Sequence, residues 1–241
     1  MSPGSAAPAA WGSEDHIVLL QFAGHTFEPL LSGALFWRAE SMLLVADLHL
    51  EKFSSYARRG QMLPPYDTGL TLKRLERDLD QTRAERVVSL GDSFHRDEGT
   101  ETLLDVDRLR LMALLGKTHW TWIAGNHDPA PHALGGVCVA VLEHRGITLV
   151  HEPRRGVRAA TIAGHLHPAA TVVANGRGAR RPCFVHDGKL LVLPAYGAGT
   201  GSMNILGPTF HGLFDYRSLE VTMLGRNRLY PVSPRRLAAG V

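Results

Sequence analysis

The sequence predicts an α/β domain with a β-sandwich core and helices on the outside. Three features lead to this prediction: short apolar runs that each end in a polar loop, two amphipathic helical segments between the early runs, and the loss of helical periodicity after residue 135. Hydrophobic residues make up 44% of the 241 residues and charged residues 20%, so the chain can bury a substantial core and is not disordered overall.

Five apolar runs are typical of buried strands, and each of them leads directly into polar residues. Side chains at the ends of neighbouring strands can converge, which is what a metal site built on a sheet requires. The predicted strands are 42–46, 86–90, 120–124, 147–150 and 159–163.

Two segments have the apolar spacing of helices with one buried face. The first predicted helix begins at Asp67 or Thr68, either of which can act as the N-cap, and runs to about Gln81. The second begins at Thr100 or Thr102. The leucines expected to face the core are Leu72, Leu75 and Leu79 in the first helix and Leu104, Leu111 and Leu115 in the second.

The remainder of the chain has the pattern of short strands. It includes a hairpin whose turn is Asp187-Gly188, between the strands 183–186 and 189–193. The two cysteines, Cys138 and Cys183, stand alone in apolar segments, and we expect both to be free, buried thiols.

Residues 1–12 are rich in Ala, Pro, Ser and Gly and lack the basic start and apolar middle of a secretory signal. We interpret 1–12 as a disordered N-terminal extension and 13–241 as a single domain. No apolar run reaches the roughly eighteen residues of a transmembrane helix, so we expect no membrane association and a cytoplasmic location.

The charges are distributed unevenly along the chain. Residues 1–150 carry 14 basic and 19 acidic side chains, a net of −5, whereas residues 151–241 carry 12 basic and 4 acidic, a net of +8. A polyanionic partner is one interpretation of this basic surplus, and a solvated, arginine-rich surface is the other.

Oxygen and nitrogen donors follow the predicted strands. Asp47 and His49 stand one residue apart, and in an extended segment both side chains would point to the same side. Asp92 follows Gly91, which allows a sharp turn, and its two oxygens can bridge two cations. Asn126 adds a neutral amide oxygen. The remaining donors are the imidazoles of His151, His165 and His167.

This mixture of donors indicates the class of metal. Oxygen and imidazole ligands suit Mn, Fe or Zn better than Ca, and the lack of Cys among the donors argues against a closed structural zinc site. Each short motif is weak evidence by itself, but the full set in this order, each at a strand end, is difficult to explain by chance.

The donor motifs resemble those of the calcineurin-like metallophosphoesterases over roughly residues 40–195. The motifs that carry the resemblance are Asp47-Leu48-His49, Gly91-Asp92, Gly125-Asn126-His127-Asp128, His151 and Gly164-His165-Leu166-His167. The resemblance implies a four-layer fold of two packed mixed β-sheets flanked by helices. It also implies two divalent ions, one held by Asp47, His49, Asp92 and His167, the other by Asp92, Asn126, His151 and His165.

Further motifs resemble the narrower group of bacterial ligase-associated metallophosphoesterases, often called PdeM. They are the run 46–52, Tyr56-Ala57-Arg58-Arg59-Gly60, the run 63–68, His151-Glu152-Pro153, Gly164-His165-Leu166-His167-Pro168 and Pro194-Ala195-Tyr196-Gly197. This resemblance implies a Mn-dependent phosphodiesterase that cleaves single-stranded DNA in a repair setting, in functional association with a DNA ligase, a helicase and an exonuclease.

Several residues beside the donors are candidates for catalysis. We predict that His127, next to Asn126, donates a proton to the leaving oxygen or contacts the transition state. Asp92 is the second catalytic candidate, as the ligand that bridges the two ions. Asp128 either orients the imidazole of His127 or caps the loop. His95, three residues after Asp92, either lies near the site as a candidate substrate contact or begins a surface helix.

The candidate substrate contacts are charged or aromatic residues. Arg58 and Arg59 contact flanking phosphates or end a solvated helix, and Arg154 and Arg155 follow the donor His151. Tyr196, in a glycine-rich loop, stacks on a base or belongs to the core.

The alternatives to a DNA endonuclease are a phosphatase, a small-molecule or cyclic-nucleotide phosphodiesterase with the same metals, and a non-catalytic scaffold. Scaffolds typically lose ligands, and none is missing here. A homodimeric assembly is left open by the sequence.

Overall fold

The computed structural model describes residues 18–58, 60, 64–174 and 177–239. The expected N-terminal extension, 1–12, lies outside the described residues. Among the described residues, no helix is both long and apolar enough to cross a bilayer.

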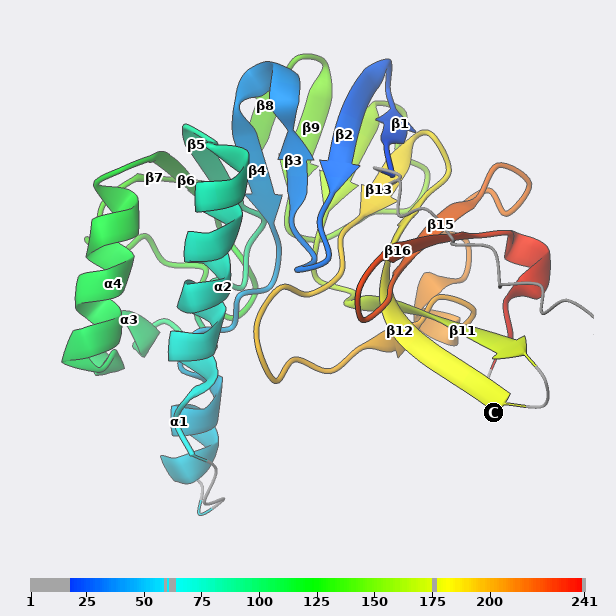
Figure 1. Ribbon diagram of the computed structural model, residues 1–241. Coiled ribbons are helices and arrows are strands. Elements are labelled where there is room, and N and C mark those ends of the chain that lie inside the picture. Colours follow the sequence, from blue (N-terminus) through cyan, green and yellow to red (C-terminus); the bar gives the residue numbers. More distant parts are fainter. Residues whose placement is uncertain (1–17, 59, 61–63, 175–176, 240–241) are drawn as a thin grey trace, which may run out of the picture.

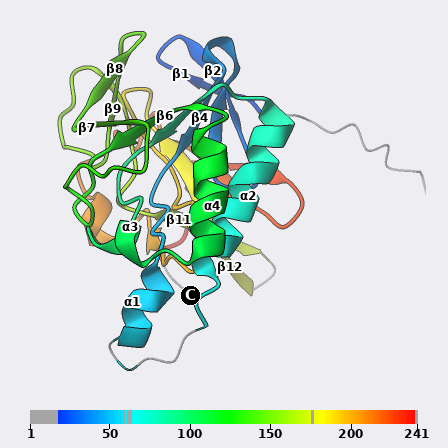
Figure 2. The same cartoon turned by 90° about the vertical axis from the view of Figure 1, so that its left-hand side faces the viewer.

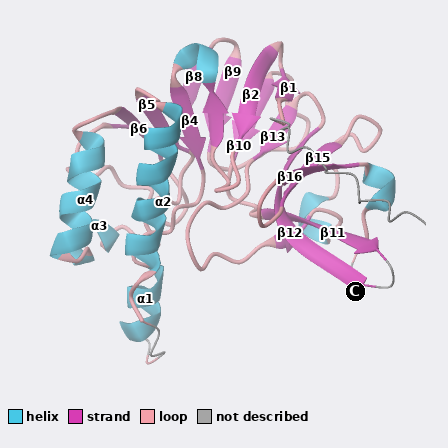
Figure 3. Ribbon diagram, in the orientation of Figure 1, coloured by secondary structure: helices cyan, strands magenta, loops and turns pink. Residues whose placement is uncertain are grey.

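The first sheet carries the early strands and one half of the site. Its strands lie in the order β1-β2-β3-β4-β5-β6-β7, antiparallel up to β4 and parallel from β4 to β7 (Figures 1 and 3). They span Leu20–Phe22, His25–Pro29, Leu35–Trp37, Met42–Val45, Arg86–Ser89, His119–Ile123 and Val137–Val139. The parallel strands bring the loops after β4, β5 and β6 to the same edge of the sheet.

The second sheet carries the remaining donors and has the order β14-β11-β12-β13-β10-β9-β8, with β15 paired to β12 and β16 to β15. Its strands are β8 (Leu142–His144), β9 (Ile147–Val150), β10 (Ala160–Ala163), β11 (Pro168–Ala174), β12 (Arg177–His186), β13 (Leu190–Val192), β14 (Met203–Asn204), β15 (Glu220–Leu224) and β16 (Leu229–Val232). The parallel strands β9, β10 and β13 point their carboxyl ends toward the site.

The helices α2 (Asp67–Thr82) and α4 (Asp105–Leu115) cover the outer face of the first sheet (Figures 1 and 2). The shorter elements are α1 (Lys52–Arg58), α3 (Gly99–Thr102) and the 3₁₀ turns η1 (Arg38–Glu40), η2 (Pro208–Phe210) and η3 (Pro234–Arg236). The far side of the second sheet is covered by η2 and the loop after it, so the helical cover is thick on one side and thin on the other.

Three apolar clusters separate four layers. Leu72 and Leu111 represent the cluster between the helices and the first sheet. Trp37 and Ile162 belong to the cluster between the two sheets, and Phe210 to the cluster beyond the second sheet. Each sheet is covered by an apolar cluster on both faces, which explains why its central strands are mostly apolar runs rather than alternating ones. The predicted α/β fold with two packed mixed sheets and flanking helices is confirmed.

The five predicted strands are all present as β4, β5, β6, β9 and β10, within one residue or so of their expected bounds. The hairpin at Asp187-Gly188 is also present, with Val185 opposite Val192. Both cysteines are free, although only Cys183 is fully buried and Cys138 is half-buried.

Two details of the helix predictions are wrong. Asp67 and Thr68 do not cap α2; instead Asp67 accepts the Phe53 N–H (3.0 Å) and Thr68 accepts the Glu51 N–H (2.8 Å), so both satisfy the first turn of α1. The second helix begins at Asp105 and not at Thr100 or Thr102, which lie in the separate short helix α3; Leu104 is therefore 49% exposed, and Leu103 takes the buried position.

Candidate metal centre

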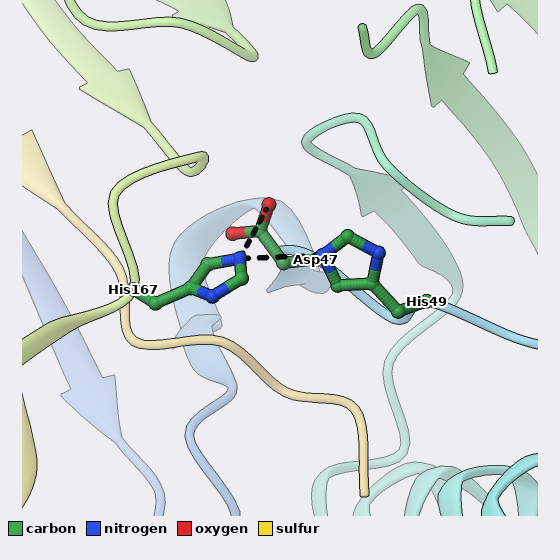
Figure 4. Close-up of side chains that lie close together, drawn as sticks. All are labelled: Asp47, His49 and His167. Atoms are coloured by element: carbon green, nitrogen blue, oxygen red, sulfur yellow. Dashed lines mark hydrogen bonds and ion pairs between the residues drawn. The ribbon is translucent and has the colours of Figure 1, made fainter. Parts of the chain in front are cut away.

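The first donor group joins the loop after β4 to the loop before β11. The nearest side-chain atoms of Asp47, His49 and His167 lie within 4.8 Å of one another, and Figure 4 shows the two imidazoles and the carboxylate converging. The His167 Nε2 atom lies 3.3 Å from His49 Nε2 and 3.4 Å from Asp47 Oδ1. Asp47 and His49 are almost fully buried.

The second donor group joins the loops after β5, β6, β9 and β10. It contains Asp92, His151 and His165, again within 4.8 Å. His151 Nε2 lies 3.3 Å from Asp92 Oδ1, 3.1 Å from His165 Nδ1 and 2.9 Å from Asn126 Oδ1, so the amide of Asn126 joins this group. The other oxygen of Asp92, Oδ2, lies 3.9 Å from His49 Nε2 and so reaches toward the first group.

The backbone at the donors is unusual. Asp47, His49, Asp92, His165 and His167 all have positive φ, between 44° and 70°. The expectation of an extended Asp47–His49 segment is therefore wrong, although the two side chains do converge. Left-handed conformations at non-glycine residues cost free energy and persist where the surroundings hold them, as functional sites often require. Here the Asp47 N–H donates to Gly91 O (3.2 Å) and the His49 N–H to Asp92 O (2.9 Å).

Two glycines allow the loops to approach so closely. A Cβ atom at Gly91 would lie 2.4 Å from His151 Nδ1, and one at Gly125 would lie 2.2 Å from the Asp92 backbone nitrogen. Neither contact is sterically allowed, so only glycine at these two positions lets the donor loops pack this closely.

The electrostatics of the second group favours a cation. Burial of His151 acts to lower its pKa, but the hydrogen bond and the charge of Asp92 outweigh burial and raise the pKa of His151 to about 9. Burial likewise acts to raise the pKa of Asp92, but His151 holds it below its ordinary range. The carboxylates of Asp92 and Asp47, which stabilise a proton on His151, would also attract a metal ion bound there.

The first group is arranged differently, because burial dominates there and lowers the pKa of His49. A neutral imidazole offers its lone pair to a metal ion, which is the form that ligation requires. Facing, buried donor atoms without a proton between them are unfavourable unless a cation lies among them. The residues present therefore fit two divalent ions, one in each group.

His127 lies beside both groups without belonging to either. Its Nε2 is 3.9 Å from Asp92 Oδ2, its backbone N–H donates to Asp92 Oδ1 (2.9 Å), and its side chain is 41% exposed. The ring stacks on His95, with centroids 5.0 Å apart, and His95 also contacts the ring of His49. The structure thus places His95 next to the site rather than on a remote surface.

Asp128 braces the site loops. Its Oδ2 accepts the backbone N–H groups of Ser93 (2.8 Å) and Phe94 (3.0 Å), and its Oδ1 accepts that of Gly125 (3.1 Å). Burial raises its pKa to about 6 despite these donors. The geometry favours the loop-capping alternative over orientation of the His127 imidazole, because both carboxylate oxygens are used by the backbone.

Tyr196 is a core residue, and base stacking by its ring is ruled out by this position. The side chain is 0% exposed, and its hydroxyl donates to Asp78 Oδ2 (2.8 Å), 118 positions away in sequence. Its backbone N–H donates to Ala46 O (2.8 Å), which fixes the strand end that leads into Asp47.

The candidate arginines are placed unequally. Arg59 lies outside the described residues, as does the side chain of Arg58, which ends α1. Arg154 and Arg155 are exposed in the loop between β9 and β10, three and four residues after His151.

Two further residues near the site were not predicted from the sequence. Glu51 is 4% exposed and accepts from Thr68 Oγ1 (3.0 Å) and Ser54 Oγ (2.7 Å), so it joins α1 to α2. The charge of Lys52 contributes to the lowered pKa of His49, after the larger effects of burial and of other neighbours. The signals for these residues were their position directly after the first donor motif and their place in the run 46–52 that carries the narrower resemblance.

Two packed mixed sheets with donor-bearing loops at their strand ends define a fold of the metallophosphoesterase type. Among solved structures, the chain is similar to the Pseudomonas putida nuclease MPE, with 27% identity and a TM-score of 0.69 over 89% of this chain and 99% of that chain. A weaker likeness, with 14% identity and a TM-score of 0.37, is to Yfce, a phosphoesterase from E. coli, over 83% of this chain and 97% of that chain. No protein-family model and no curated protein matches the sequence.

Proposed function

We propose that the protein is a metal-dependent phosphodiesterase that cleaves single-stranded DNA. The observation that carries this proposal is the position of Asp92 between two donor groups, with Oδ1 3.3 Å from His151 and Oδ2 3.9 Å from His49. One carboxylate that reaches both groups suits a pair of ions that act together on one phosphate.

The ligand assignment follows from the two groups. Asp47, His49 and His167 would hold one ion and His151, His165 and Asn126 the other, with Asp92 shared. Divalent ions held there, which we propose to be Mn, would supply an activated water as the nucleophile and would offset charge on the phosphoryl oxygens. The half-exposed His127 is the chain's own candidate for giving a proton to the leaving oxygen, with His95 stacked behind it to hold the ring.

Two observations support DNA as the substrate. The part of the chain that supplies His151, His165 and His167 has a net charge of +8, which attracts a polyanion. The similar structure with 27% identity is that of a nuclease. We propose a role in DNA repair because several motifs resemble those of the bacterial ligase-associated metallophosphoesterases.

The direct test is incubation of the purified protein with circular single-stranded DNA and Mn. An endonuclease converts the circles to linear fragments. If the circles stay intact while p-nitrophenyl phosphate is hydrolysed faster than bis-p-nitrophenyl phosphate, the protein is a phosphatase instead.

Metal removal should abolish the activity. Because the proposed ligands are hard or borderline oxygen and nitrogen donors, Mn should restore the rate in chelated protein better than Mg or Ca. Hydrolysis of bis-p-nitrophenyl phosphate measures the rate, and elemental analysis of the same sample measures the residual metal. Full turnover in protein shown to be free of metal would contradict the proposal.

Arg154, Arg155 and Arg158 should hold the strand near the scissile phosphate. All three are exposed and follow His151 within seven residues. Their replacement by Ala should weaken single-stranded DNA binding and flatten its salt dependence, by up to about 0.7 log units for each phosphate that an arginine no longer neutralises. Hydrolysis of bis-p-nitrophenyl phosphate should hardly change, because that diester has no flanking phosphates.

The matched control removes three positive charges elsewhere, with Lys73, Arg77 and Lys117 replaced by Ala. These exposed side chains line the groove between α2 and α4. If the two triple variants bind DNA equally well, the contact surface is not at Arg154, Arg155 and Arg158. If the small diester also becomes a poor substrate, these arginines support the structure of the site.

A further inference from the structure

A group of arginines on the second sheet has no acidic neighbours in sequence. The chain contains no Asp or Glu in residues 153–186, 188–214 and 221–241. We call the following exposed residues the ribbon arginines, because they lie on the paired strands β11 and β12 and on the C-terminal segment beside them: Arg177, Arg180, Arg181, Arg235 and Arg236.

The ribbon arginines differ from other arginines of the chain, which pair with carboxylates. Arg38 pairs with Glu28, Arg110 with Glu76, and Arg145 with Glu40. Among the described residues, none of the ribbon arginines has a carboxylate within ion-pair distance; two of their side chains donate instead to the backbone oxygens of Ser202 and Arg180. A solvated surface that only keeps the protein soluble would mix both signs of charge. This surface has one sign, as a surface that meets a polyanion does.

The ribbon is connected directly to the metal centre. β11 begins at Pro168, the residue after His167, and the Met203 N–H of β14 donates to His167 O (2.9 Å). Arg181 stands opposite Ala170 and Arg177 opposite Ala174. At about 3.3 Å per residue, these pairs lie roughly 10 Å and 23 Å along the strand from His167. The arginines therefore begin near the site and continue outward.

The C-terminal segment adds its two arginines to the same ribbon. Leu237 forms a bridge with Val172, and the Ala238 N–H donates to Thr171 O (2.8 Å). The amide of Asn204 also donates to Ala238 O (3.0 Å), so the segment is held at the edge of β11. Arg235 and Arg236 directly precede these contacts. Figure 1 shows β11 and β12 extending toward the lower right, below β15 and β16, while α1 lies at the lower left.

We propose that the ribbon arginines form a second contact surface for the sugar-phosphate backbone of the nucleic acid, on one side of the scissile phosphate and remote from it. The proposal rests on the proposed function and adds the path of the strand. The surface lies roughly 10–23 Å from His167, which corresponds to about three to seven nucleotides at 3.4 Å each, and to fewer nucleotides if the strand is extended. It follows that the surface acts on long strands and not on very short ones.

The test is a triple variant with Arg177, Arg181 and Arg236 replaced by Ala. Arg177 and Arg181 are four residues apart and point to the same face of β12, and Arg180 is kept because it holds the Ser202 backbone. Binding is measured by fluorescence anisotropy in chelator, so that it does not depend on cleavage. We expect at least about tenfold weaker binding of a strand of about twenty nucleotides, with a salt slope smaller by up to about 2, and unchanged binding of a dinucleotide, which is too short to reach from the site to the ribbon.

Two comparisons make the result decisive. The control variant of Lys73, Arg77 and Lys117 should bind both strands as the unmodified protein does, and replacement of the three ribbon arginines by Lys should retain most of the binding. Equal binding of the long strand by the Ala variant and the control would overturn the proposal. So would unchanged DNA binding with a loss of binding to anionic phospholipid vesicles, which would assign the surface to membranes.

The proposed function can fail separately. If the unmodified protein binds the long strand through the ribbon but does not cleave circular DNA, the contact surface stands and the endonuclease assignment falls. If it cleaves DNA and the Ala variant cleaves long strands at the same rate and affinity, only the ribbon proposal falls.

Discussion

Replacing Asp92 with Asn should reduce phosphodiester hydrolysis to the level of chelated protein. Asp92 is 2% exposed and contacts members of both donor groups, so the loss of its charge weakens the holding of both proposed ions at once. It also accepts the backbone N–H of His127 (2.9 Å), which an amide oxygen can still accept. The measurements are the rate with bis-p-nitrophenyl phosphate and the metal content.

Asn is a better replacement than Ala for this test. Asp92 has a φ of 47°, a conformation that Asn tolerates and Ala does not, so Asp92→Ala would mix a loss of ligand with backbone strain. A thermal unfolding midpoint near that of the unmodified protein would show that Asp92→Asn folds. Asp80→Asn, which neutralises an exposed carboxylate on α2, is the matched control and should keep full activity. An Asp92→Asn protein that folds and retains a substantial rate would exclude the bridging role.

The parts of the structure that the sequence predicted are those set by local patterns. Apolar runs that end in donors predicted β4, β5, β6, β9 and β10, because a strand buried on both faces is mostly apolar along its length and the polar donors come after it. The grouping of Asp47, His49 and His167 was implied by the resemblance of the donor motifs to a known family, and the three side chains do meet in the structure.

The parts that the sequence could not predict depend on distant contacts. The left-handed backbone of Asp47 is fixed by Gly91 O and by the His165 N–H, which donates to the Asp47 carboxylate (2.9 Å) from 118 positions away. Tyr196 in a glycine-rich loop resembles an exposed stacking residue until its partner Asp78 is known. Neither contact leaves a signal in the neighbouring residues.

The same limit explains Asp128. As the residue after His127, it has the sequence position of a carboxylate that orients an imidazole. In the fold its two oxygens meet three backbone N–H groups from two loops, which a local pattern cannot indicate. The carboxylate thus holds the loop of Asp92 against the loop of Asn126, and its effect on the reaction passes through their positions.

Replacing His127 with Ala should separate proton transfer from metal binding. His127 belongs to neither donor group, so the metal content of the variant should stay near that of the unmodified protein. Its ring is close to Asp92 but 41% exposed, a position from which it can reach a substrate bound at the site. If it protonates the leaving oxygen, DNA cleavage should slow by roughly 10²–10⁴-fold, because the leaving alkoxide is a poor leaving group without a proton.

The size of this loss should depend on the leaving group. Nitrophenolate leaves without protonation, so hydrolysis of bis-p-nitrophenyl phosphate by His127→Ala should fall far less than DNA cleavage. His119→Ala, which removes an exposed histidine at the start of β6, is the control and should change neither rate. Equal losses on both substrates would reject the proton-donor role and leave a contact to the phosphoryl oxygens as the function of His127. A loss confined to DNA, with metal content unchanged, would make the imidazole the general acid.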